Sequence, residues 1–159
     1  MTWQLRRATP DDLDAIMAIE SAVFAPDDWS RATMAAELAD GNGYYLVAFP
    51  PTDPTRVQAY AGLRSPRGAE QADIQTIAVV PEARRAGLGR VLMLQLIAQA
   101  RERGAREVFL EVRADNPAAQ SLYESLGFES IAVRPRYYLG GIDAVVMRLT
   151  VPDPEVSPA

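Results

Sequence analysis

The sequence predicts a single domain of mixed α/β class. The chain has 159 residues, of which 48% are hydrophobic, enough for one buried core. Strand-like and helix-like patterns follow one another as a strand, two helices, three strands, a helix, a strand, a helix and two strands. Because this order neither alternates strictly nor separates into blocks, a mixed sheet is expected. We expect residues 1–150 to form the domain and the proline-rich tail 151–159 to be disordered.

The first three elements are indicated by residue patterning and by helix caps. Residues 3–7 form a short strand-like run, and Thr9 then provides an N-cap that is followed directly by proline and two acidic residues. The helical pattern breaks at residues 24–29, after which Ser30 can cap a second helix that ends at Gly41. Two helices are therefore predicted after the first strand.

The middle of the chain predicts three strands and a long helix. Residues 44–49 and 56–63 are strand-like runs joined by a turn-forming segment, which indicates an antiparallel hairpin. Residues 71–80 make a third strand. Residues 91–103 then form a helix that is apolar on most faces and ends at Gly104.

The last third of the chain predicts another strand, a helix and two final strands. Asn116 precedes a proline and reads as the N-cap of the helix, and Gly127 reads as its end. The expected ranges are 107–113 for the strand, 117–126 for the helix, and 128–134 and 143–149 for the final strands.

The inventory of side chains excludes several kinds of chemistry. The chain has no Cys and no His, and all 16 of its basic residues are Arg. Disulfides, cysteine nucleophiles, Ser-His-Asp triads and Schiff-base lysines are therefore impossible, and we expect no metal site. Proton transfer must use carboxylates, tyrosines or water. The net charge of −5 argues against a nucleic-acid partner and suits a basic protein or a cationic substrate.

The sequence also predicts where the protein acts. It has no apolar run of the roughly 18 residues that a membrane span requires, so no membrane partner is expected. The lack of cysteine fits a cytosolic protein, because disulfides are rare in the cytosol. We therefore expect a soluble cytoplasmic protein.

A glycine-rich segment between the strand at 71–80 and the following helix has the pattern of an anion site. It reads Arg84-x-x-Gly87-x-Gly89, and free N–H groups and the helix dipole attract a phosphate at such a helix start. It lacks the third glycine of a dinucleotide-binding pattern and the lysine of a phosphate-binding P-loop, so a pyrophosphate ligand is favoured. The alternative is a tight turn with solvated arginines.

Several segments together resemble the GCN5-related N-acetyltransferase (GNAT) family, over residues 4–149. Residues 84–89 match its signature Q/R-x-x-G-x-G/A, and the runs FLEVRADNPAAQSLYESLGF, RPRYY and FAPDDWS are similar to its ribosomal-protein alanine N-acetyltransferase branch. The resemblance implies a mixed, mostly antiparallel sheet with helices on both faces. This sheet would be splayed where residues 77–79 and 107–112 lie side by side.

The resemblance implies acetyl-CoA as the co-substrate. Main-chain groups of Ile77, Ala78 and Val79 would align its pantetheine, and an N–H near Val79 would polarise the thioester carbonyl. Asn116 would touch the coenzyme as well as cap its helix. The pyrophosphate would be held by the loop residues Arg84, Arg85, Ala86, Gly87, Leu88, Gly89 and Arg90.

Glu111 and Tyr123 are the catalytic candidates. Strand alternation puts Glu111 on the face opposite Val108, Leu110 and Val112. A partly buried carboxylate has a raised pKa that suits a base near neutral pH. The resemblance makes Glu111 the proton acceptor, directly or through one water, and Tyr123 the donor to the coenzyme A sulfur. The alternatives are an ion pair of Glu111 with Arg113 or another arginine, and core packing for Tyr123.

The expected acceptor is the α-amine of a protein N-terminus. At pH 7 an α-amine is neutral about once in ten, and lysine only about once in two thousand. Trp29, Tyr137 and Tyr138 are aromatic residues of predicted loops that flank a peptide slot or else anchor the loops. The resemblance implies the N-terminal alanine of a basic small-subunit ribosomal protein as acceptor. Asp27 and Asp28 either attract a cationic peptide or lie in a solvated turn.

Two other functions stay open at this point. The same fold could acetylate a lysine side chain or a small-molecule amine. A protein of another class, a non-catalytic acyl-CoA sensor or interaction module, would bind acetyl-CoA without turnover. The presence of both Glu111 and Tyr123 favours an enzyme over a sensor.

Overall fold

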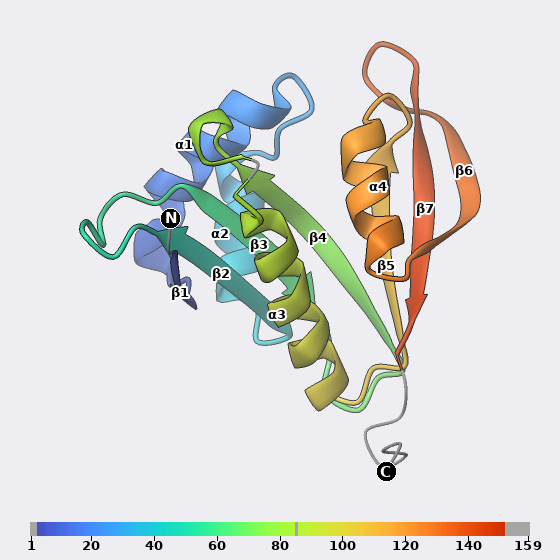
Figure 1. Ribbon diagram of the computed structural model, residues 1–159, viewed down its shortest axis with the longest axis horizontal. Coiled ribbons are helices and arrows are strands. Elements are labelled where there is room, and N and C mark those ends of the chain that lie inside the picture. The colour runs from blue at the N-terminus through green and yellow to red at the C-terminus, as the bar shows by residue number, and fades with distance from the viewer. Residues whose placement is uncertain (1–2, 85, 152–159) are drawn as a thin grey trace.

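The computed structural model describes residues 3–84 and 86–151. In this part of the chain, strands form one sheet in the order β1-β2-β3-β4-β5-β7-β6 (Figure 1). The strands are β1 (Gln4–Arg7), β2 (Gly43–Phe49), β3 (Ala59–Arg64), β4 (Gln71–Val79), β5 (Glu107–Arg113), β6 (Glu129–Tyr138) and β7 (Ile142–Thr150). The helices are α1 (Leu13–Phe24), α2 (Arg31–Ala39), α3 (Leu88–Glu102) and α4 (Pro117–Ser125), with short 3-10 turns η1 (Pro10–Asp12) and η2 (Pro81–Ala83). None of the described helices is long and apolar enough to cross a membrane.

The sheet is antiparallel except at the junction of β4 and β5, which confirms the mixed, mostly antiparallel prediction. These two strands are parallel and pair only from Gln71 with Glu107 to Asp73 with Phe109. Beyond that point they diverge, and Figure 1 shows the widening gap between their ribbons. We predicted the opening along all of residues 107–112, but it begins only after Phe109, because the first part of β5 is hydrogen-bonded to β4.

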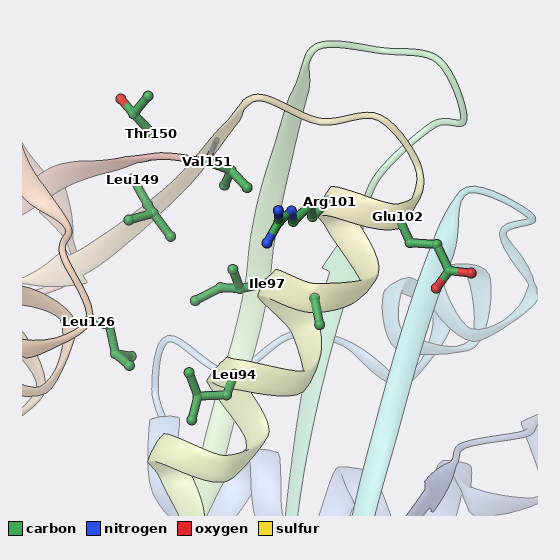
Figure 2. Close-up of a pocket in the computed structure, with 9 residues that line it drawn as sticks. Leu94, Ile97, Arg101, Glu102, Leu126, Leu149, Thr150 and Val151 are labelled. Carbon is green, nitrogen blue, oxygen red and sulfur yellow. The ribbon is translucent and has the colours of Figure 1, made fainter. Parts of the chain in front are cut away.

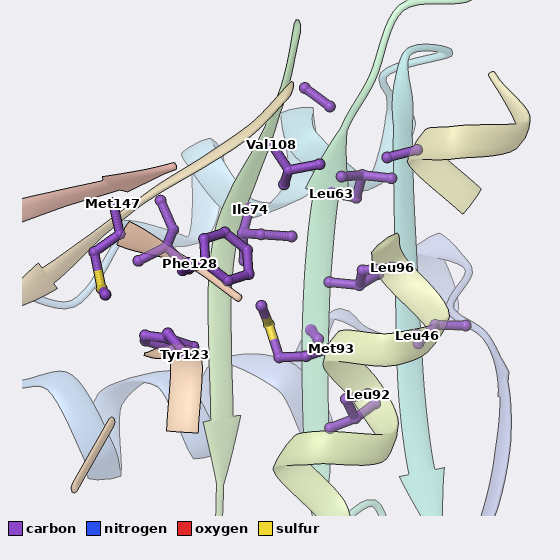
Figure 3. Packing of buried hydrophobic residues seen from close by; sticks show 14 of the residues in the cluster. Leu46, Leu63, Ile74, Leu92, Met93, Leu96, Val108, Tyr123, Phe128 and Met147 are labelled. Atoms are coloured by element: carbon purple, nitrogen blue, oxygen red, sulfur yellow. The ribbon is translucent and has the colours of Figure 1, made fainter. Parts of the chain in front are cut away.

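Helices lie on both faces of the sheet, as expected. Helices α1 and α2 lie on one face, and α3 and α4 lie on the other (Figure 1). The larger core lies beneath α3 and includes Leu92, Leu96 and Leu63, whose packing Figure 3 shows. The smaller core lies beneath α1 and α2, around Ile16 and Met34. Burying each such side chain contributes about 1.5–3 kcal/mol, so both helix layers are held mainly by these apolar contacts.

An irregularity in β4 changes which side chains face each helix layer. The register with β3 shifts so that Leu63 opposes Ile74 and Gly62 opposes Thr76, which leaves Gln75 as an extra residue. Before this bulge, Ile74 packs in the core under α3, whereas after it Ala78 packs in the core under α1 and α2. A bulge inserts one residue and thereby reverses the alternation of the strand.

The predicted cap at Ser30 is confirmed, whereas Thr9 caps the 3-10 turn η1 that leads into α1. The Thr9 hydroxyl accepts from Asp11 N–H, and Asp12 accepts from Thr9 N–H in return. The Ser30 hydroxyl accepts from Thr33 N–H at 3.1 Å. These side chains satisfy N–H groups that a first helical turn leaves without partners, so the local sequence determines where η1 and α2 begin.

The largest difference from the predicted elements is the length of β6. The strand was expected to end at residue 134, but it continues to Tyr138, which pairs with Ile142 of β7. Gly140 and Gly141 both have positive φ angles, which allow the tight connection to β7. Pro135 lies on an edge strand and within the irregularity between Arg134 and Tyr138, and both are places where a sheet tolerates proline.

Candidate active site

The glycine-rich loop places free N–H groups at the start of α3. Gly87 is the N-cap of this helix with φ of 75°, and no side chain caps the helix there. A Cβ at Gly87 would meet no atom within 4 Å, so the backbone borders open space. A Cβ at Gly89 would lie 3.5 Å from Leu122 Cδ2, so α3 and α4 approach closely at this point. This geometry fits a pyrophosphate bound by main-chain N–H groups.

The arginines of the loop have partners in the protein. Arg84 Nε donates to the carbonyl of Val79 at 3.0 Å, and Arg90 Nη1 donates to Ser125 Oγ at 3.0 Å. Arg84 therefore ties the loop to the end of β4, and Arg90 joins α3 to α4. Ala86 and Leu88 lie on either side of Gly87, and Arg85 lies outside the described residues.

The end of β4 borders the opening in the sheet. On one side, this end of β4 pairs with β3 through Ile77, Ala78 and Val79. On the other side, the pairing of β4 with β5 has already ended at Asp73. Within the described chain, the edge of β4 that faces the opening is therefore free to align a bound chain. Asn116 caps α4 by accepting from Ala119 N–H at 3.2 Å, as predicted.

Glu111 lies on β5 just past the point where the strands part. Its side chain is 29% exposed, and Arg134 Nε lies 3.2 Å from its Oε1. The ion pair with an arginine, which we held as the alternative to a catalytic role, is thus present. Val108 and Val112 are buried on the opposite face of β5, so the predicted alternation is confirmed.

Glu111 shares a cavity of about 380 Å³ with all three aromatic residues expected at the acceptor side. Trp29 comes from the loop between α1 and α2, and Tyr137 and Tyr138 come from the end of β6. The two tyrosines were predicted in a loop and instead lie on a strand, because β6 extends past its bulge to pair with β7. The cavity is also lined by the apolar side chains of Ile74, Leu110 and Val146. Polar groups come from Asp73 and Gln75.

The titratable groups of this cavity influence one another. Burial and a hydrogen bond to Glu111 raise the pKa of Tyr137. Burial, with a smaller effect from the charge of Glu111, raises the pKa of Tyr138 to about 12. Burial also raises the pKa of Asp73. The positive charge of Arg64 lowers this pKa in part, and the negative charge of Glu111 raises it further. Both tyrosines are therefore hydrogen-bond donors across the neutral pH range.

Tyr123 lies on α4, on the face of the sheet that also carries α3. Its ring is 7% exposed and packs edge-on against Phe128, with centroids 6.1 Å apart. Burial raises its pKa to about 12. The predicted packing is therefore confirmed. No hydrogen bond of its hydroxyl is found within the described residues, which leaves this group able to donate to a ligand.

The loop between α1 and α2 is fixed from two sides. Glu20 of α1, which is 2% exposed, accepts from Trp29 N–H at 2.9 Å and also from the Tyr60 hydroxyl. Asp27 accepts from Arg113 and from Leu139 N–H. The carboxylate of Asp27 is thus occupied by partners within the protein. It is neither open to bind a cationic peptide nor part of a solvated turn, the two interpretations that the sequence allowed.

Sequence reasoning missed several residues of the cavity. Gln71, Asp73 and Gln75 were not singled out, although polar residues at every second position of an otherwise apolar strand indicate a common exposed face. Arg134 was also missed. Its contact with Glu111 depends on β6 lying two strands away across β7, which the local sequence does not indicate.

A second cavity, of about 510 Å³, lies on the face of α3 near the end of β7. Figure 2 shows Leu94 and Ile97 of α3 on the side that faces Leu126 and Leu149. Val151 also lines it and is buried, with its N–H bound to the carbonyl of Arg106 at 2.7 Å. None of the predicted site residues lines this cavity, and the rest of the predicted tail, 152–159, lies outside the described residues.

Known proteins resemble the chain over most of its length. A ribosomal protein bS18-alanine N-acetyltransferase of Escherichia coli is 37% identical over 143 residues, 88% of this chain and 92% of that protein. The N-alpha-acetyltransferase RimI of Mycobacterium tuberculosis is 36% identical over 152 residues, 92% of this chain and 91% of that protein. An uncharacterized protein of Mycobacterium leprae is 40% identical over 144 residues, but the chain spans only 38% of that longer protein.

Solved structures agree in fold. The crystal structure of the ribosomal-protein-S18-alanine N-acetyltransferase from Escherichia coli superimposes with a TM-score of 0.83 at 33% identity and covers 94% of each chain. NAA60 of Arabidopsis thaliana in complex with acetyl-CoA has a TM-score of 0.85 at 18% identity, over 94% of this chain and 99% of that one, which shows the shared fold. Residues 13–128 match the acetyltransferase (GNAT) family. The chain therefore belongs to this family and is an acetyl-CoA-dependent N-acetyltransferase.

Proposed function

We propose that this enzyme transfers the acetyl group of acetyl-CoA to the α-amine of a protein N-terminus, and that its acceptor is the N-terminal alanine of ribosomal protein bS18 in the cytoplasm. The observation that carries the proposal is the cavity in which Glu111 meets Trp29, Tyr137 and Tyr138. The names of the two full-length relatives supply the acceptor class.

The position of this cavity supports a two-sided site. The loop at the start of α3 lies on one face of the sheet, whereas the cavity is lined by the α1–α2 loop and by β6. Because pairing between β4 and β5 ends at Asp73 and Phe109, no ladder hydrogen bonds close the sheet between them beyond that point. Acetyl-CoA would occupy the first face, held by main-chain groups of residues 77–79 and 86–90, with its thioester reaching the opening. The peptide would enter from the second face.

Glu111 is the proposed base. It accepts a proton from the acceptor amine, directly or through one water, as the nitrogen forms its bond to the thioester carbonyl carbon and the carbon–sulfur bond breaks. The partner Arg134 is 59% exposed, so its ion pair with Glu111 is a surface pair worth only about 0–1 kcal/mol. A cationic N-terminus can therefore displace Arg134 at little cost.

Tyr123 is the proposed acid, which returns a proton to the departing coenzyme A thiolate. It lies on the face of the sheet assigned to acetyl-CoA, and its pKa of about 12 keeps it protonated at any pH at which the enzyme is assayed. An N–H near Val79 would stabilise negative charge on the thioester oxygen, a role that main-chain groups fill without a special side chain.

The α-amine suits this site better than a lysine does. At pH 7 the free energy needed to deprotonate an α-amine is about 3–4 kcal/mol smaller than for lysine, since their pKa values differ by about 2.6 units. One carboxylate base supplies a proton-transfer effect of about 10²–10⁴-fold, which matches the smaller requirement.

The test offers three acceptors to the purified protein with acetyl-CoA: a peptide with the basic N-terminus of bS18, an N-blocked peptide with one lysine, and a small primary amine. Fragmentation mass spectrometry locates the added acetyl group. We expect acetyl on the α-amine of the first peptide alone. Acetyl only on lysine or on the small amine would overturn the proposed acceptor, and acetyl-CoA binding without transfer to any amine would support a sensor instead.

A further inference from the structure

The loop between α1 and α2 reaches across the open end of the split in the sheet. Its Asp27 accepts from Arg113 Nη1, at the end of β5, at 3.0 Å. The same carboxylate accepts from Leu139 N–H, in the turn between β6 and β7, at 2.9 Å. Its side chain is only 16% exposed. Asp27 therefore ties the part of the molecule that carries α1 and α2 to strands β5–β7, where β4 and β5 no longer hold each other.

The contacts continue from Asp27 into the acceptor cavity. The Arg113 guanidinium lies 5.2 Å from the centre of the Tyr138 ring, within the range of a cation–π interaction. The Tyr138 ring meets Tyr137 edge-to-face, with centroids 5.1 Å apart and planes at 87°. Tyr137 lines the same cavity as Glu111, whose negative charge contributes to its raised pKa. Neighbouring side chains thus connect the loop to the cavity that holds the proposed base.

Asp28, the next residue, provides a natural contrast. Its carboxylate accepts from Ser21 Oγ at 3.1 Å, so its contact stays within α1 and the loop that follows it. The two aspartates are neighbours of equal charge, and only Asp27 crosses the split in these contacts. Because its bond to Arg113 joins two ionised groups, it is stronger than a neutral hydrogen bond.

We propose that Asp27 is a positioning residue for the acceptor, which holds Arg113 and the β6–β7 turn so that the tyrosine-bearing wall of the cavity stays at the spacing that fits a peptide N-terminus. This inference rests on the proposed function. Without Asp27, the wall formed by Tyr137 and Tyr138 moves independently of the α1–α2 loop that carries Trp29, and fewer bound peptides reach Glu111 in a productive pose. The loop that binds acetyl-CoA lies on the other face and is unaffected.

The kinetic test compares Asp27→Ala and Asp27→Asn with the control Asp28→Ala. We expect Asp27→Ala to raise KM for the bS18 peptide about tenfold, equivalent to about 1.4 kcal/mol, with the affinity for acetyl-CoA unchanged. Asp27→Asn, which keeps an acceptor for Leu139 N–H but loses the charge, falls between. Arg113→Gln should raise KM in the same direction, and the effects of the two substitutions should be less than additive in the double variant, since Asp27 and Arg113 share one contact although each also has a partner of its own, Leu139 N–H and Asp115. An unchanged KM in Asp27→Ala overturns the proposal.

A second readout does not depend on which amine is acetylated. Hydrogen exchange of the Leu139 amide should be faster in Asp27→Ala and unchanged in Asp28→Ala, since only Asp27 accepts this N–H. If the wild-type enzyme acetylates another amine, the proposal for the acceptor is wrong. The variants are then compared by their KM for that amine instead of their KM for the peptide. Faster Leu139 exchange with an unchanged KM shows a purely structural contact and overturns the positioning role. Circular dichroism checks that each variant is folded.

Discussion

The carboxylate of Glu111 combines a structural contact with a proposed chemical one. Its ion pair with Arg134 was the alternative to a catalytic role, yet the two are compatible because the pair is largely exposed and weak. The same carboxylate lines the acceptor cavity together with Tyr137, whose pKa its charge helps to raise. A base that is held by weak partners before the substrate arrives keeps its orientation and still exchanges those partners for an amine.

Replacement of Glu111 by Gln tests the base directly. We expect kcat to fall by about 10²–10⁴-fold, the usual contribution of a general base, with the dissociation constant of acetyl-CoA unchanged. Glu107→Gln is the matched control: it lies on the same face of β5, pairs with Arg148 at 3.6 Å, and belongs to the part of β5 that is hydrogen-bonded to β4. Steady-state kinetics and isothermal titration calorimetry give the two quantities. A kcat within twofold of the wild type would remove Glu111 as the base.

Individual site residues were predictable where a motif carries them. Glu111, Tyr123 and the loop residues follow from a resemblance in sequence, and the cap role of Asn116 follows from local chemistry alone. Arg134 and Asp27 could not be found in this way. Their partners lie on other elements, and such pairings depend on sheet order and on a loop conformation that no local pattern determines.

At the scale of elements, the start of α3 is the feature that sequence reasoning described best. The glycine pattern predicted an anion site, and the structure shows a left-handed Gly87 beside open space, followed by the free N–H groups of a 15-residue helix. The helix begins at Leu88 rather than at residue 91, because the loop itself forms its first turn. The end of β6 was harder to predict, since it is determined by pairing with β7.

Gly87→Glu tests the role of this loop. A negatively charged side chain would occupy the space beside the N–H groups and repel a pyrophosphate, so acetyl-CoA binding should fall below detection in calorimetry. Gly68→Glu is the control, because Gly68 also has a positive φ, of 84°, and open space around its Cβ. Both variants incur the same backbone strain of about 1–2 kcal/mol. If both bind acetyl-CoA equally, the loop is a turn only.

At the scale of the whole molecule, buried tyrosines predict a loss of stability at alkaline pH. Burial raises the pKa of Tyr123 to about 12, and it raises those of Tyr45 and Tyr60 in the same direction. Above pH 10 the unfolded chain releases these protons and the folded chain keeps them, so the free energy of unfolding falls as pH rises. Below pH 10 both states are protonated and this contribution is fully present.

The measurement is urea unfolding between pH 8 and pH 11. The wild type should lose stability progressively above pH 10, and Tyr123→Phe, which keeps the ring but has no proton to release, should lose it less steeply. A two-unit rise in pKa corresponds to about 3 kcal/mol at full titration. Identical slopes for the two proteins would show that Tyr123 titrates alike in the folded and unfolded states.

The early end of the pairing between β4 and β5 has a consequence for the order of events in a catalytic cycle. A sheet normally separates its two faces with an unbroken ladder of hydrogen bonds, but here the ladder between β4 and β5 ends at Asp73 and Phe109. In the proposed arrangement, with the coenzyme on the side of α3 and the peptide on the side of α1, neither substrate would block the entrance of the other. The acetyl group would then pass directly from one substrate to the other in a ternary complex, with no covalent acetyl-enzyme. Each product would likewise leave by its own side of the sheet.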